Sequence, residues 1–189
     1  MAFLSINEIF NLIVMTIAVG YIFSGRFVVP KKVKDPLLNY EKYSFWEDFK
    51  FAILVAAPGV ILHELMHKII ALSFGLQAVF KAYWFGLGLG IILKLVNAPF
   101  LILAPAFVEI SGNVTNLQSS LISFAGPGTN LALFLIAFFM LKRKLKQKEI
   151  IFWGLTKHIN LVLFIFNMIP IPPLDGFKVF YGLWKVLAG

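Results

Sequence analysis

The chain has 189 residues, 60% of them hydrophobic and 14% charged, with a mean hydropathy of +0.87. This composition excludes an ordinary soluble domain and indicates a polytopic membrane protein, in which 21 phenylalanines suit lipid-facing and interfacial surfaces. The net charge of +8 does not indicate a nucleic-acid partner, because the basic residues cluster in short loops beside apolar segments, where they direct topology and contact lipid headgroups.

Two apolar stretches near the beginning of the chain predict transmembrane helices. The first covers residues 9–23 and is expected to be a retained helix, since no basic region precedes it and no small-residue cleavage site follows. A polar connector with two prolines follows over residues 24–46, with an interfacial turn expected near residues 43–46. The second helix is expected over residues 49–74, where Pro58 and Gly59 predict a kink or a loosened turn.

A small β-region is expected after the second helix. Alternating side chains predict one strand over residues 79–84 and a second over residues 104–110. The glycine-rich stretch 86–90 and the apolar residues after it fit a segment that enters the bilayer, one that lies on it, or a hairpin. Because unpaired strands are not tolerated against lipid, the sheet must sit in the interface or within protein.

Two further helices are expected over residues 121–141 and 150–168, joined by a strongly basic loop. Pro170, Pro172 and Pro173 then exclude a continuing helix, so an extended segment in polyproline form is expected before the apolar tail 177–189. The predicted fold is therefore mainly α: a polytopic membrane protein with about four transmembrane helices and a small membrane-associated β-region between helices two and three.

The run His63-Glu64-Leu65-Met66-His67 lies inside the second predicted helix. One helical turn separates the two histidines, so both imidazoles can face one ion, and Glu64 stands where it can reach water at that ion. Charged side chains at the centre of a bilayer cost about 2.5 to 3.5 kcal/mol each and are seldom kept without a use. The pattern therefore predicts a catalytic zinc site.

A catalytic zinc usually takes three protein ligands, and the chain contains no cysteine to supply a thiolate. The candidates for the third ligand are Glu109, His158 and Asp175. Asp175 is the preferred one, because it follows an unwound backbone that must line a protein cavity, and a carboxylate there needs a cation. The alternative for Asp175 is an interfacial residue at a helix end, and His158 beside a lysine is more typical of an interface than of a ligand.

Three segments in this order resemble the site-2 protease family of intramembrane zinc metalloproteases: the histidine helix, the turn Ala125-Gly126-Pro127-Gly128-Thr129-Asn130, and the segment 167–176 with its Asn-x-x-Pro-x-Pro-x-Leu-Asp-Gly pattern. The resemblance implies that His63, His67 and Asp175 bind one zinc ion per chain.

By the same resemblance Glu64 would be the catalytic acid and base. Asn167 would help to hold the scissile carbonyl or its oxyanion, and Asn130 would support substrate binding. For both asparagines the alternative is hydrogen bonding between helices.

The resemblance also implies an expected organisation and substrate. Residues 1–48 would form a first transmembrane helix and connector, and residues 49–189 an intramembrane metalloprotease core. The substrate would be a transmembrane segment of a membrane protein. A separate hypothesis, which rests only on the alternation of side chains, is that a strand edge at residues 79–84 or 104–110 captures the unwound substrate by strand addition. The protein would be a multi-pass integral protein of the cell membrane. Charge pattern and resemblance give opposite orientations of the active site, and the sequence selects neither.

Two other functions stay open on the sequence. A membrane-embedded zinc endopeptidase of the prenyl-protein protease type would share the histidine run but take its third ligand from an acidic helix downstream. A non-catalytic membrane adaptor would keep the ligands without cleaving, although a structural zinc site has no need of Glu64.

Overall fold

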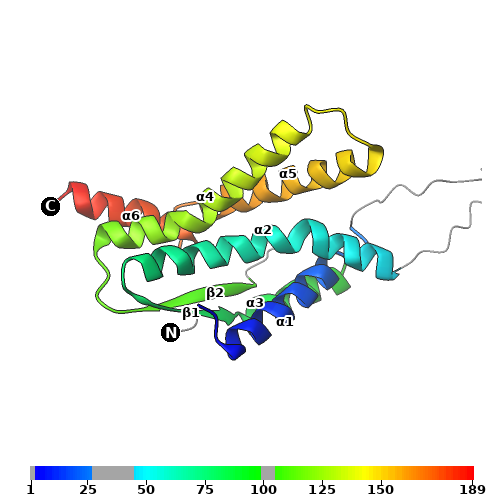
Figure 1. Ribbon diagram of the computed structural model, residues 1–189. Coiled ribbons are helices and arrows are strands. Elements are labelled where there is room, and N and C mark those ends of the chain that lie inside the picture. Colours follow the sequence, from blue (N-terminus) through cyan, green and yellow to red (C-terminus); the bar gives the residue numbers. More distant parts are fainter. Residues whose placement is uncertain (1–2, 27–44, 99–104) are drawn as a thin grey trace, which may run out of the picture.

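The computed structural model describes residues 3–26, 45–98 and 105–189 and shows a mainly helical protein with one small sheet (Figure 1). The elements, in chain order, are α1 Ile6–Phe23, α2 Phe45–Ser73, β1 Gln77–Ala82, α3 Trp84–Leu95, β2 Ala106–Ser111, α4 Asn116–Met140, α5 Gln147–Asn167 and α6 Asp175–Leu187. The predicted mainly α fold with a β-region between the second and third long helices is confirmed.

Within the described residues, four helices are long and apolar enough to cross a membrane: α1, α2, α4 and α5. Each begins a few residues before the position expected from its hydropathy. For α1 and α4 the reason is a capping box, in which Ser5 pairs with Glu8 and Thr115 pairs with Gln118. The first residues of α2 include part of the expected interfacial turn, whose residues 43–44 lie outside the described range.

Helix α2 is the centre of the molecule (Figure 1). On one side it packs against α1 and the sheet, and on the other against α4 and α5, while α6 packs along α4. The main core joins Met15 and Val19 of α1, Val60 of α2 and Phe80 of β1. The helix continues through Pro58, so the proline does not end it.

The stretch after β1 is helical: α3 contains all three glycines between residues 86 and 90. Its 12 residues are too few to cross a bilayer about 30 Å thick at 1.5 Å per residue. Helix α3 contacts α1 and connects the two strands. The sequence left three alternatives for this stretch: entering the bilayer, lying on it, or forming a hairpin. The helix excludes the hairpin.

The outer edge of β2 is unpaired among the described residues. β1 and β2 are antiparallel, with Phe80 opposite Val108, and the Tyr83 N–H donates to the Pro105 carbonyl at 2.9 Å. Because hydrogen-bonded and non-bonded pairs alternate in such a ladder, the backbone groups of Ala106, Val108 and Ile110 face away from β1. No further described strand pairs with that side of β2.

The proline-rich segment after α5 forms turns, so the predicted polyproline form is wrong. A polyproline helix has no internal hydrogen bonds. Here the Ile169 N–H donates to the Phe166 carbonyl at 3.2 Å, and the Leu174 N–H donates to the Ile171 carbonyl at 2.9 Å. After these turns α6 starts at Asp175 and continues along α4 in the same direction as α5, where the Ser120 hydroxyl of α4 donates to the Val179 carbonyl of α6 at 3.1 Å (Figure 1).

Candidate metal centre

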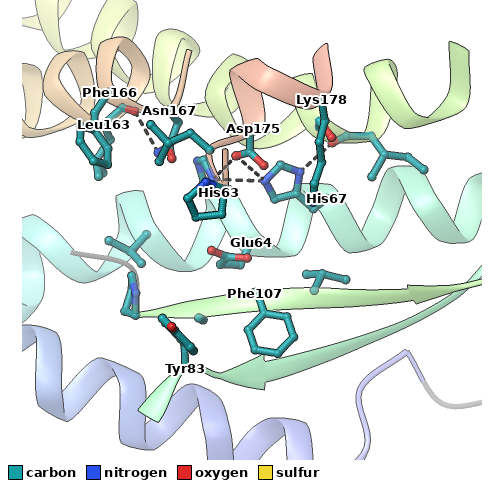
Figure 2. A pocket seen from close by; sticks show the side chains of 18 of the residues that line it. His63, Glu64, His67, Tyr83, Phe107, Leu163, Phe166, Asn167, Asp175 and Lys178 are labelled. Atoms are coloured by element: carbon teal, nitrogen blue, oxygen red, sulfur yellow. Dashed lines mark hydrogen bonds and ion pairs between the residues drawn. The ribbon is translucent and has the colours of Figure 1, made fainter. Parts of the chain in front are cut away.

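Three possible metal ligands converge between α2 and the start of α6. The Nε2 atoms of His63 and His67 lie 3.1 Å apart, and each lies 3.2 Å from Oδ2 of Asp175 (Figure 2). Both histidines are buried, and the aspartate is half-buried. The structure therefore brings together the three residues predicted as ligands, although Asp175 lies more than a hundred positions after the two histidines in the chain.

The other ring nitrogen of each histidine has its own partner. Nδ1 of His63 lies 2.6 Å from Oδ1 of Asn130, and Nδ1 of His67 lies 2.7 Å from the Ile122 carbonyl oxygen. An amide or carbonyl oxygen can only accept, so both Nδ1 atoms carry the proton. The Nε2 lone pairs are therefore directed at each other and at a carboxylate, an arrangement that a shared cation stabilises.

The donor set fits zinc. Tetrahedral ligands about 2.0–2.1 Å from a zinc ion lie about 3.3–3.4 Å from one another, close to the separations in this cluster. Two imidazole nitrogens and one carboxylate oxygen are also the ligand types of hydrolytic zinc sites with an open fourth position.

Gly126 of α4 leaves the space beside these nitrogens. A Cβ atom at this position would lie 2.7 Å from Nε2 of His63 and closer still to Nε2 of His67. A helix carrying any other residue here could not approach the imidazoles so closely. Gly126 is therefore required for the close packing of α4 against the two metal-binding imidazoles.

Asp175 reaches the histidines because α6 begins at this residue. The approach needs Gly176, since a Cβ atom there would lie 2.7 Å from the Ile169 carbonyl oxygen and closer to the backbone of Met168. The carboxylate is thereby placed with Oδ2 at 3.2 Å from Nε2 of both histidines. Ionised carboxylate is the form that binds a metal.

A cavity of about 310 Å³ opens beside the three ligands. Its walls include Glu64 of α2, Asn167 at the end of α5 and residues 105–108 of the β2 edge. Figure 2 shows the Glu64 carboxylate between the histidines and the sheet, on the side of Phe107. The side-chain amide of Asn167 donates to the Leu163 carbonyl at 3.0 Å, which fixes its orientation at the cavity wall.

Asn130, which was predicted to support substrate binding, lies away from the wall of this cavity. Asn130 is fully buried (0% exposed) and is not part of the cavity wall. Besides accepting from His63, it donates to the Gly59 carbonyl and to Oδ1 of Asn160, each at 3.0 Å. The residue therefore connects α2, α4 and α5, as the alternative of interhelical hydrogen bonding proposes.

The two other candidate ligands lie away from the cluster. Glu109 is exposed and forms an ion pair with Lys81 at 2.6 Å across the sheet. His158 is exposed on α5, where its Nδ1 lies 2.7 Å from the Gly154 carbonyl oxygen. Neither side chain contributes to the cavity.

Three buried polar side chains are not predicted from the sequence as part of the site or its surroundings: Asn160, Glu8 and Lys68. Asn160 is bonded to Asn130, while Glu8 of α1 is paired with Lys68, the residue after His67. Each lies within a stretch that is apolar enough for a membrane span. A polar residue in such a stretch usually has a partner, and that signal was available for all three.

Fold and site together define a helical protein with membrane-spanning character and a buried site of two histidines and one carboxylate, suited to a hydrolytic metal ion. The chain is 36% identical, over 175 residues, to a protein of Methanocaldococcus jannaschii named putative zinc metalloprotease. The match covers 92% of this chain and 83% of that protein. The chain belongs to this family of zinc metalloproteases.

Two bacterial proteins with the same descriptive name are also similar. One from Bacillus subtilis is 37% identical over 81 residues, which is 35% of this chain and 35% of that protein. One from Synechocystis is 31% identical over 138 residues, which is 70% of this chain and 31% of that protein. No family model matches the chain. No solved structure matches it either.

Proposed function

We propose that this protein is an intramembrane zinc endopeptidase of the site-2 protease type, which hydrolyses a peptide bond in or near a transmembrane segment of a membrane-protein substrate. One observation carries the proposal: the His63, His67 and Asp175 cluster shares a cavity with Glu64. Proteolysis needs a metal site with an open position and a general base within reach, and this cavity offers both.

The depth of the site supports cleavage within the membrane. His63 lies ten residues before the end of α2 at Ser73, or about 15 Å along the helix at 1.5 Å per residue. A hydrocarbon core is about 30 Å thick, so this distance fits a site well below the surface of the bilayer. We assign the protein to the cell membrane as a multi-pass protein with one zinc ion per chain.

The residues of the cavity divide the chemistry among them. A zinc ion held by His63, His67 and Asp175 would lower the pKa of a water molecule towards neutrality and polarise the scissile carbonyl. Glu64 takes the proton from the attacking water and returns it to the leaving amine. Asn167 donates one amide N–H to the Leu163 carbonyl, and its second N–H, which has no partner in the described part of the chain, can donate to the substrate carbonyl or its oxyanion.

Asn130 acts through His63. Its Oδ1 keeps the proton of this imidazole on Nδ1, so that Nε2 is available to the metal. The Ile122 carbonyl has the same role for His67. A fixed tautomer and ring orientation are required of both ligands before the site can bind zinc tightly.

The substrate is captured as a strand. The backbone N–H and C=O groups of Val108 face away from β1, and β2 lines the cavity that contains Glu64. A substrate helix must unwind before cleavage, since its carbonyls are already hydrogen-bonded, and an unwound segment can pair with this free edge. Of the two strand segments considered from the sequence, the second is the one we propose.

The two alternative functions are less well supported. An endopeptidase of the prenyl-protein protease type would take its third ligand from an acidic helix downstream, whereas here the carboxylate ligand is the first residue of α6, directly after the proline-rich turns, and α6 contains no other acidic residue. A non-catalytic adaptor would have no use for a buried Glu64 facing the cavity.

A cleavage assay tests the proposal. Purified protein in detergent is mixed with a transmembrane model substrate, and the wild type is compared with Glu64→Gln and with chelator-treated protein. Cleavage by the wild type should exceed that by Glu64→Gln about 10²–10⁴-fold, the usual contribution of a general base. Zinc should restore the chelated wild type alone. Equal cleavage by Glu64→Gln and wild type would refute the mechanism.

A further inference from the structure

Helix α1 carries a buried carboxylate that the proposed chemistry does not use. Glu8 is 4% exposed. Its Oε2 accepts from the Ser5 N–H at 2.8 Å within the capping box, and its Oε1 accepts from the backbone N–H of Phe80 in β1 at 2.7 Å. A charged group this deeply buried costs several kcal/mol unless it is fully paired, so its position is strongly determined.

The partner of Glu8 belongs to the helix that carries the metal ligands. Lys68 directly follows His67 on α2, is 3% exposed, and forms an ion pair with the same Oε1 atom. One carboxylate therefore joins three elements: α1, the histidine helix and the sheet. Through Glu8, β1 is therefore connected to α2 at Lys68, the residue next to the metal ligand His67.

The contact with Phe80 also makes the two edges of the sheet different. In the register that pairs Phe80 with Val108, the Phe80 N–H faces away from β2. Glu8 occupies this donor, and α1 packs along β1. The Phe80 N–H is thereby unavailable to a further strand on the outer side of β1, while the outer side of β2 lines the cavity.

We propose that Glu8 is a positioning residue for substrate binding: by accepting the Phe80 N–H it fixes the sheet against α2, so that the free edge of β2 stands at the correct distance from Glu64. This inference rests on the proposed function, because it concerns the strand on which that function places the substrate. The effect acts through the backbone of β1 and β2, and Glu8 itself does not touch the substrate.

Two double variants separate this role from general stability. Glu8→Gln/Lys68→Met removes both charges and leaves one side-chain oxygen that can accept from Phe80. Glu8→Met/Lys68→Met removes both charges and the acceptor. Neither leaves an unpaired buried charge, and replacing a buried ion pair by apolar groups of similar volume is often tolerated. Both variants keep the other half of the capping box, in which the Ser5 hydroxyl accepts from the backbone N–H of residue 8 at 3.3 Å.

The measurements are KM, kcat, zinc content, and amide hydrogen exchange of the β1 and β2 peptides. We expect the Gln/Met variant to keep its KM within about twofold of wild type, while the Met/Met variant shows a KM raised about tenfold, a loss comparable to that of one or two backbone hydrogen bonds. Exchange in β1 and β2 should be faster in the Met/Met variant, with kcat and zinc content unchanged.

Equal KM values in the two variants would overturn the inference, as would unchanged exchange in β1 and β2. Faster exchange with an unchanged KM would reduce Glu8 to a purely structural residue and would overturn it too. A wild type that cleaves nothing would instead refute the proposed function, and the exchange data would still show whether Glu8 fixes the strand.

Discussion

Oδ1 of Asn130 lies 2.6 Å from Nδ1 of His63, and the amide of the same asparagine donates to the Gly59 carbonyl and to Asn160. A residue of α4 thus sets the orientation and tautomer of a ligand on α2, while a residue of α5 fixes the asparagine in turn. The imidazole is directed before any metal binds, which lowers the cost of forming the site.

Asn130→Ala should weaken zinc binding about 10- to 100-fold, since it leaves the His63 Nδ1–H without an acceptor. Zinc affinity is measured by competition with a chromophoric chelator. Asn160→Ala is the matched control, because it removes a buried hydrogen bond of the same network one residue further from the metal.

Both substitutions should lower the free energy of unfolding to a similar extent, by about 1–3 kcal/mol, because each leaves a buried polar group unpaired. Only Asn130→Ala should lose zinc affinity, because in Asn160→Ala the Gly59 carbonyl still holds the Asn130 amide. If the two variants bound zinc equally tightly, the orienting role of Asn130 would be wrong.

Gly126→Ala should abolish zinc binding, because the added methyl group would occupy the space of the Nε2 atoms of His63 and His67. Gly154→Ala in α5 is the control: among the described residues, no atom outside the surrounding turns of α5 backbone lies within 4 Å of a Cβ placed there, and alanine favours a helix by about 1 kcal/mol over glycine. The measurement is the zinc content of the two purified variants by elemental analysis, which should be near zero for Gly126→Ala and close to that of wild type for Gly154→Ala. A Gly126→Ala protein with full zinc content would contradict the close approach of α4 to the imidazoles.

Val108→Pro should raise KM for a transmembrane substrate about tenfold or more, since it removes a backbone donor that faces the cavity and that the substrate strand would use. Proline is tolerated on an edge strand where its missing N–H faces outwards, so the sheet should persist. Val108→Ala keeps the N–H and should leave KM close to that of wild type. Equal KM values for the two variants would argue against strand addition at β2.

The sequence allowed the metal ligands to be predicted because their chemistry is local or depends on an uncommon pattern. His63 and His67 are one helical turn apart, so helical geometry alone places them together. Asp175 could be named because a carboxylate after an unwound apolar segment needs a cation. The four long helices followed from hydropathy in the same way.

The remaining features depend on which elements pack together, and a sequence read in isolation does not contain that information. The hydrogen bond from Asn130 to Asn160 and the pairing of Glu8 with Lys68 join residues far apart in the chain. Residues 168–174 form turns and not the predicted polyproline segment. Prolines exclude a helix, but they do not select between turns and an extended chain.

The zinc content of Asp175→Ala tests the central claim most directly. The site requires one ion held jointly by His63 and His67 of α2 and by the first residue of α6. Elemental analysis of detergent-purified protein should find one zinc per wild-type chain and a nearly complete loss in Asp175→Ala at equal folded fraction. Full zinc occupancy in Asp175→Ala would contradict the claim.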